Sequence, residues 1–318
     1  MGNDVNLLDE AQAVALIEKE SLASVAACDG RRLDNAVICV ANDGLYLYFG
    51  GLTTTLKGRL MLARSTVALT IGSMQYHGSA RVLPHGSDDY LRARATYDRK
   101  FPQYAKLFEL EDNELFELRP LALWLYDGVN GVLNRPFLVK DEGYFRSLDR
   151  DAPRDAGRDH PEGAREIDYL ALEKEAIAFA SSRLDAVLAT ESGGIVAARS
   201  MTILWSGLEA WLQTSVHSEK WTQISQNPNV AICAGNMQIE GKAERRGTAF
   251  EKGNEWFLER YPAVHAGSFE RYGRLPEERV VLVHPTRVSF WKYIDGKPFR
   301  DHLDILRRKA WRSDMASN

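Results

Sequence analysis

The feature that most constrains the fold of this chain is an internal repeat with an offset of 163 residues. Residues 44–80 align without a gap with residues 207–243, and ten of these 37 positions are identical. Upstream, residues 22–28 resemble residues 184–190. The identical positions of the first copy are Gly44, Leu45, Lys57, Val67, Ala68, Gly72, Met74, Gln75, Gly78 and Ala80. A gapless match of this length predicts two similar structural units.

The repeat divides the chain into three parts. We expect a first unit at residues 1–139, a linker at 140–165 and a second unit at 166–318. The linker segment is crowded with Asp, Arg, Gly and Pro and has no counterpart in the repeat, as is typical of a connecting segment. Each unit has the size of an ordinary domain and can bury a core without disulfides.

Both units show the same coarse pattern of secondary structure. A helical stretch, at 9–20 and again at 167–181, precedes several short runs rich in β-branched and aromatic residues. Hairpin turns are expected at 42–44 and 205–207. Short strands at close spacing favour barrels, so the predicted fold class is mainly β with α (α+β), with two units able to pack as an intrachain pseudo-dimer. Residues 297–312 are expected to form an amphipathic C-terminal helix.

Composition excludes several classes of protein. The formal net charge of −4 gives no reason to expect nucleic acid or an anionic membrane as a partner. No apolar run approaches the roughly 18 residues of a membrane helix and no signal segment is visible, so we expect a cytoplasmic protein. Cys28, Cys39 and Cys233 form no CxxC pair and are expected to be buried free thiols. No metal site is expected, because the histidines show no ligand spacing.

The segment from 198 to 235 carries the pattern of an anion site. A strand expected to begin at Arg199 precedes a second strand that ends at Thr214, and the following loop places Ser218 and Lys220 at the start of a helix. Unpaired N–H groups and the helix dipole favour an anion there, and Lys and Arg add charge. The simpler alternative is a surface Arg beside a Ser helix cap. His217 in this loop either contacts the anion or caps the turn.

The order of these pieces resembles the pyridoxamine 5'-phosphate oxidase-like FMN-binding split-barrel family. The pieces are ARSMTIL, LQT, HSEK, NPNVAICA and IEGKAE, in that order. The resemblance implies tandem split β-barrels that hold FMN at an interface, with the first repeat as the opposite barrel. It further implies that Arg199, Ser218 and Lys220 hold the FMN phosphate. The flavin ring would then lie along a surface formed by Arg199, Ser200, Met201, Thr202, Gln213 and Thr214.

The first repeat keeps only part of this pattern. Thr55 and Lys57 align with Ser218 and Lys220, so both also count as candidate cofactor-binding residues. Ala36 stands at the Arg199 position and Gly51 at the Thr214 position. Losing the guanidinium removes a charge-assisted bond worth about 1.5–3 kcal/mol, so the first site is predicted to be degenerate or repurposed, with Arg59 as a residue able to compensate.

These features predict an FMN-dependent oxidoreductase of the pyridoxamine 5'-phosphate oxidase-like type. Its partner would be a small-molecule substrate or an electron donor such as a nicotinamide nucleotide, and a homodimer is compatible with an exposed barrel face. Vitamin B6 oxidation is disfavoured, because Glu219 stands where the true oxidase often has a second Arg. The family's substrate-binding Arg and His are also not recognisable near the C-terminus.

Two alternatives stay open. The same fold could bind flavin or haem without catalysis, with His284 or His302 as a haem ligand, or both sites could be vestigial in an interaction module. Trp124 and Tyr126, and correspondingly Trp291 and Tyr293, lie on the last strands of the two repeats. They belong either to the cores or beside the flavin.

Overall fold

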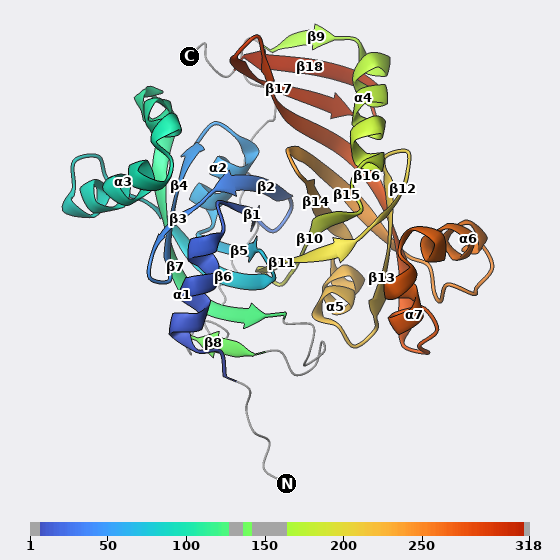
Figure 1. Ribbon diagram of the computed structural model, residues 1–318. Coiled ribbons are helices and arrows are strands. Elements are labelled where there is room, and N and C mark those ends of the chain that lie inside the picture. The colour runs from blue at the N-terminus through green and yellow to red at the C-terminus, as the bar shows by residue number, and fades with distance from the viewer. Residues whose placement is uncertain (1–6, 127–135, 142–163, 315–318) are drawn as a thin grey trace.

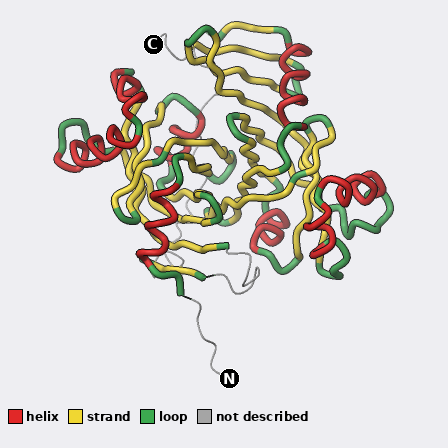
Figure 2. Tube along the Cα trace, in the orientation of Figure 1, coloured by secondary structure: helices red, strands yellow, loops and turns green. Residues whose placement is uncertain are grey.

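The computed structural model describes residues 7–126, 136–141 and 164–314 (Figure 1). Two curled sheets form the centre of the molecule and the helices lie around them (Figure 2). The fold is mainly β with α, as predicted. Most of the predicted linker lies outside the described residues. Within those residues, no helix is long and apolar enough to cross a bilayer.

The first half supplies one sheet and its helices. Its elements are α1 (Glu10–Lys19), β1 (Leu22–Cys28), β2 (Leu33–Cys39), β3 (Ala41–Asp43), β4 (Tyr46–Leu52), α2 (Leu56–Ala63), β5 (Thr66–Ile71), β6 (Met74–Val82), α3 (Asp88–Lys100), the 3-10 helix η1 (Pro102–Glu109), β7 (Asn113–Leu125) and β8 (Phe137–Val139). The strand order is β2-β1-β5-β6-β7-β4-β3, with β8 paired to β7.

The second half repeats this arrangement and extends it. Its elements are β9 (Arg165–Ile167), α4 (Tyr169–Ser181), β10 (Asp185–Ser192), β11 (Ile195–Thr202), β12 (Leu204–Ser206), β13 (Glu209–Ser215), α5 (Glu219–Gln226), β14 (Asn229–Ala234), β15 (Met237–Arg245), α6 (Glu255–Val264), α7 (Ala266–Tyr272), β16 (Glu278–Ile294), β17 (Lys297–Asp304) and β18 (Lys309–Asp314). The order β11-β10-β14-β15-β16, with β13 on β16 and β12 on β13, matches the first sheet strand for strand. Strands β17, β18 and β9 extend the sheet beyond β16.

A matching irregularity supports the internal repeat. The pairing of β6 with β7 shifts between His77 and Gly78, and the pairing of β15 with β16 shifts between Glu240 and Gly241. These positions are 163 residues apart (240 − 77). A Cβ at Gly241 would lie 2.7 Å from the His284 carbonyl oxygen, so close backbone approach requires glycine there. The bulge is therefore built into both copies of the sheet.

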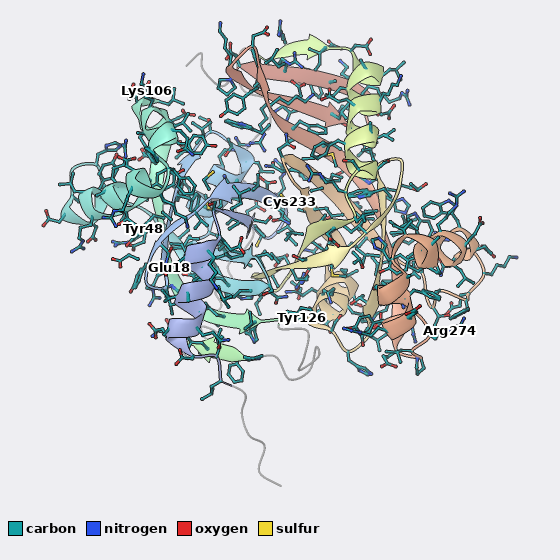
Figure 3. The ribbon with its side chains drawn as sticks, in the orientation of Figure 1. Glu18, Tyr48, Lys106, Tyr126, Cys233 and Arg274 are labelled. Carbon is teal, nitrogen blue, oxygen red and sulfur yellow. The ribbon has the colours of Figure 1, made fainter. Side chains whose placement is uncertain are left out.

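The two halves form an intrachain pseudo-dimer. Each half has its own core, and a third apolar cluster contains residues of both. Strand β5 packs on β11, and β2 packs on β14 and β10. Across this interface the Asn35 side chain donates to the Val187 carbonyl at 2.7 Å, and Arg32 binds both carboxylate oxygens of Glu240 at 3.0 Å. Figure 3 places Cys233 near the middle of the molecule, where the halves meet.

The predicted C-terminal helix at 297–312 is wrong. These residues form the hairpin of β17 and β18, seen at the top of Figure 1. Asp301 is fully buried in this hairpin and accepts bonds from Arg312 at 2.6 Å and from Lys292 at 2.9 Å. The chain reverses near Arg308, which has a φ of +52°. Cross-strand charge pairing, which a helical pattern does not reveal, therefore decides the local structure.

The three cysteines are free thiols, as predicted. Cys28 and Cys233 are buried, whereas Cys39 is only partly buried. Burial raises the pKa of Cys28 to about 12, which keeps this thiol protonated and unreactive.

Candidate functional site

The N-terminus of α5 brings together three of the residues singled out in the sequence. Ser218 caps the helix and accepts from the Trp221 N–H at 3.3 Å. The Thr214 and Ser218 hydroxyls are 2.9 Å apart, and Lys220 Nζ donates to Thr214 Oγ1 at 3.2 Å. Two hydroxyls, an ammonium and the first N–H groups of a helix thus converge at the end of β13, an arrangement suited to an anion.

Arg199 is buried, with 6% of its surface exposed, and is linked to the same helix. Its Nη1 donates to Thr190 Oγ1 at 2.6 Å, and Thr190 in turn bonds to Gln223 of α5. The strand that carries Arg199 begins at Ile195 and not at Arg199, so the guanidinium extends from the middle of β11. A residue in mid-strand is held more firmly than one at a strand end, and here Thr190 adds a further restraint.

The remaining candidates of the second half lie on a different side. Thr202 Oγ1 is 2.7 Å from the Tyr261 hydroxyl of α6, and Gln213 donates to the Tyr272 carbonyl of α7 at 3.3 Å. Successive side chains of a strand point to opposite faces, so Gln213 and Thr214 face away from each other. Ser200 is exposed, and Met201 is partly buried against the core of this half.

The first half contributes side chains next to Arg199. His77 of β6 is 2% exposed, and its ring centroid lies 4.9 Å from that of Trp124 on β7. Burial, together with the nearby Arg199 charge, lowers the pKa of His77 to about 3, so the ring is neutral. The opposite barrel thus reaches the second-half site. Sequence reasoning missed His77, because only the fold brings it to Arg199.

Glu278 is a second residue that the sequence pattern did not reveal. It begins β16, pairs with Ser215 in register and is 8% exposed. Burial raises the pKa of Glu278 to about 7, with Glu277 adding to the rise, while the Lys220 charge opposes it. A carboxyl that titrates near neutrality therefore lies beside the ammonium of the site.

Two residues of the loop, His217 and Glu219, have exposed side chains. Glu219 is exposed in the first turn of α5, so it is open to solvent screening. The His217 side chain is exposed, and its backbone N–H donates to Ser215 Oγ at 3.2 Å.

The first-half loop has the same local geometry. Thr55 caps α2 and accepts from the Gly58 N–H at 3.2 Å. Ala36 pairs with Val25 as Arg199 pairs with Leu188, which confirms that no arginine stands at this position. Burial, together with Arg300 of the second half, lowers the pKa of Lys57 to about 8.

The aromatic residues of the last strands correspond differently from the prediction. Gln75 pairs with Trp124, whereas its repeat counterpart Gln238 pairs with Ser289. Trp124 therefore corresponds to Ser289, and the predicted match with Trp291 is wrong by two residues. The two sites consequently differ in the side chain at this position of the last strand, which is Trp124 in one half and Ser289 in the other.

The two candidate haem ligands, His284 and His302, are both hydrogen-bonded through Nδ1. His284 bonds through Nδ1 to Glu209 at 2.9 Å and through Nε2 to Glu244 at 2.8 Å. The Glu244 hydrogen bond, with that of Glu209, raises the pKa of His284. His302 Nδ1 is 3.1 Å from Ser289 Oγ. No cluster of three or more metal-binding side chains occurs among the residues placed in the structure.

Comparison with protein families confirms the resemblance for the second half. Residues 172–292, from α4 to most of β16, match the family model described as pyridoxamine 5'-phosphate oxidase. A comparison with curated proteins finds no match.

Several solved structures are similar to this chain at low identity. A heme binding protein from Mycobacterium smegmatis is 21% identical, with 37% of this chain and 52% of that chain covered and a TM-score of 0.32. General Stress Protein 26 from Bacillus anthracis is 19% identical, with 37% and 92% covered and a TM-score of 0.32. A pyridoxamine 5'-phosphate oxidase-related, FMN binding protein from Nostoc punctiforme is 14% identical, with 46% and 94% covered and a TM-score of 0.31.

Proposed function

We propose that this protein, whose second half matches the pyridoxamine 5'-phosphate oxidase family, is an FMN-binding oxidoreductase with one flavin site at the N-terminus of α5. The observation that carries the proposal is the cluster of Thr214, Ser218 and Lys220 at the capped end of a helix. Such a cluster supplies the charge and the donors that a phosphate monoester requires.

The residues present fit the phosphate end of FMN. Lys220 supplies a point charge, Ser218 and Thr214 supply hydroxyl donors, and the first turn of α5 supplies free N–H groups. Arg199 on β11 is linked to the same helix through Thr190, and its hydrogen bond to Thr190 fixes the direction of the guanidinium. A preorganised guanidinium loses little freedom when it binds an anion.

The first half would cover the other side of the ligand. Neutral His77, with Trp124 packed against its ring, provides an uncharged surface near Arg199, which suits an aromatic ring system. When bound, FMN would supply the hydride or electron transfer, while the protein binds it, orients it and excludes water. The substrate would be a small molecule, and a nicotinamide nucleotide is a suitable electron donor.

The absorption spectrum of the purified chain tests this function. We expect a flavin spectrum, with one FMN per chain released on denaturation and measured by its fluorescence. A Soret band would instead support the haem-binding alternative. A colourless protein that takes up no added FMN would overturn the proposal. Bound flavin that no nicotinamide nucleotide or other small-molecule donor reduces would favour a non-catalytic flavin-binding protein.

A further inference from the structure

A group of charged side chains from both halves lies close enough for their charges to interact, and its members come from α2, β2 and β17. We call it the cross-half cluster: Lys57, Arg300 and Asp34, bordered by the Arg32–Glu240 ion pair. Arg300 is 8% exposed and Asp34 is 3% exposed, so both are withdrawn from bulk water. The cluster adjoins the capped N-terminus of α2, which resembles that of α5. It lies outside the site proposed for FMN.

The Lys57 ammonium forms no direct ion pair among the placed residues of this cluster, although the charge of Asp34 opposes the fall of its pKa. The ammonium lies 5.7 Å from the centroid of the Phe49 ring. Burial and the charge of Arg300 lower the pKa of Lys57 to about 8. Two cations held near each other away from water repel, and an anion between them would relieve that repulsion.

Arg300 supplies the group that Ala36 lacks. It extends from β17, opposite Trp291, and donates to the Gln238 side chain through Nη2. A guanidinium has five donors, so one such bond leaves capacity for a bidentate contact. Since β17 belongs to the second half, the arginine missing from β2 is replaced from across the interface.

Asp34 adds a hydrogen-bond acceptor that is not satisfied within the protein. Its Oδ1 accepts from the Asn35 N–H at 2.9 Å, whereas its buried Oδ2 has no partner in the described part of the chain. Buried polar atoms normally have a partner. The corresponding position of the second half is Ala197, since Ala27 pairs with Asp34 as Thr190 pairs with Ala197. The cluster is therefore not a simple copy of the other site.

We propose that the cross-half cluster is a second ligand site, which takes a phosphorylated small molecule that also carries hydroxyl groups. Lys57, Arg300 and the α2 N-terminus bind the phosphate, and Asp34 Oδ2 accepts from a ligand hydroxyl. A sugar phosphate and the ribityl phosphate of a flavin share this chemistry. The two sites of the chain thus differ in composition. Arg199 belongs to the same half as Lys220, whereas Arg300 belongs to the half opposite Lys57.

Calorimetric titration of the full chain tests this site. The chain carries Arg199→Ala and Lys220→Ala, which disable the site proposed for FMN. We expect ribose 5-phosphate to bind once per chain, and ribose, which lacks the phosphate, not to bind. Arg300→Gln or Lys57→Met should weaken binding by roughly tenfold or more, because each removes a charge-assisted contact. Arg92→Gln, which removes an exposed arginine on α3, is the matched control and should change nothing.

Further titrations identify the kind of phosphorylated ligand and provide variants to use if Arg300→Gln does not fold. FMN that binds in this background and depends on Arg300 would make the site a second flavin site, and FMN that fails to bind would make it a sugar-phosphate site. If Arg300→Gln does not fold, Arg300→Lys, which retains the charge but loses the bidentate geometry, should weaken binding by less than the tenfold expected of Lys57→Met. Asp34→Asn should reduce the preference for ribose 5-phosphate over inorganic phosphate.

Proton uptake gives an independent readout. At pH 8 phosphate binding should raise the pKa of Lys57 and take up protons, which titrations in two buffers measure, and Lys57→Met should abolish the uptake. The proposal is overturned if no phosphate ester binds, or if Arg300→Gln and Lys57→Met leave binding unchanged. Loss of FMN from the unmodified chain alone would contradict only the function proposed for the α5 site.

Discussion

The charge of the Lys220 ammonium opposes the rise in pKa of the Glu278 carboxyl, which begins β16 opposite Ser215 at the end of β13. Burial raises the pKa of Glu278 to about 7, and only the charge of Lys220 and that of Arg279 limit the rise. Near neutral pH the site therefore exists in two charge states. In the neutral state Glu278 does not oppose an anion at Lys220, whereas in the ionised state a carboxylate competes with the anion for the lysine charge.

The first prediction is that FMN binds more weakly as pH rises from 6 to 8. Ionised Glu278 repels the phosphate and pairs with Lys220, so affinity should fall by roughly threefold to tenfold relative to Glu278→Gln. Fluorescence titration at each pH measures the FMN affinity of the unmodified chain and of Glu278→Gln. The ratio of the two affinities is unaffected by the protonation of FMN itself. Glu259→Gln on exposed α6 is the control. An equal pH profile for the unmodified chain and Glu278→Gln would contradict the prediction.

The raised pKa of Glu278 also predicts that the free energy of unfolding falls as the pH rises. Because the folded pKa of Glu278 is raised, its contribution is fully present below the ordinary Glu pKa, about 4.3, and is lost as pH rises through about 7. Urea unfolding at several pH values should show a shallower decline over this window for Glu278→Gln. A variant whose stability declines as steeply as that of the unmodified chain would show that Glu278 does not control this window.

The sequence predicted the parts of the site that are local in the chain. Thr214, Ser218 and Lys220 lie within seven consecutive residues, so strand, loop and helix cap are set by local pattern. His77, Glu278 and Arg300 come from strands that reach the two sites only through sheet pairing and the interface. No spacing rule along the chain relates these residues to the loops that they adjoin.

The error at residues 297–312 has a similar cause. Alternating charged and apolar residues there fit a helix or a strand equally well, and the choice depends on partners for Asp301. Arg312 is eleven residues away and Lys292 nine, distances along the chain that pair across a hairpin but not within one helix turn. Long-range charge pairing decided the structure.

Arg199 gives a prediction about FMN affinity. Arg199→Ala should weaken FMN by roughly tenfold to a hundredfold, because a charge-assisted bond is worth about 1.5–3 kcal/mol. Thr190→Val keeps the volume but releases the guanidinium from its tie at 2.6 Å, so a smaller loss is expected. Arg260→Gln, which is exposed on α6, serves as the control. If Thr190→Val and Arg199→Ala lose the same amount of FMN affinity, the hydrogen bond between Arg199 and Thr190 would account for the whole effect of Arg199.

The interface between the halves gives a prediction about stability. Asn35 is fully buried, accepts from the Ser24 hydroxyl at 2.7 Å and donates to the Val187 carbonyl at 2.7 Å. Asn35→Ala removes both of these buried hydrogen bonds, at a cost of about 1–3 kcal/mol each. Urea unfolding should show this loss, whereas Asn42→Ala, which removes an exposed bond within one half, should cost less than about 1 kcal/mol. Equal losses in the two variants would contradict a specific role for the interface.

Asp301 gives the last prediction. Burial alone would raise the pKa of its carboxyl, but hydrogen bonds from Arg312 and Lys292 hold that pKa below its ordinary value. The ionised Asp301 therefore stabilises the folded state above the ordinary Asp pKa, about 3.9. This stability is lost as the pH falls through the lowered pKa of Asp301. Asp301→Asn should lower the free energy of unfolding at pH 7 by about 3–5 kcal/mol, because two cations lose a buried partner.

Unfolding of Asp301→Asn and of the unmodified chain should converge as the pH falls below the pKa of Asp301, since both side chains are then neutral. Asp295→Asn, in the turn before β17, is the control and should leave stability at pH 7 nearly unchanged. A constant difference between Asp301→Asn and the unmodified chain at every pH would show that packing, rather than charge, holds the hairpin. Because Arg300 is the neighbour of Asp301 on β17, a loosened hairpin should also weaken phosphate binding at the cross-half cluster.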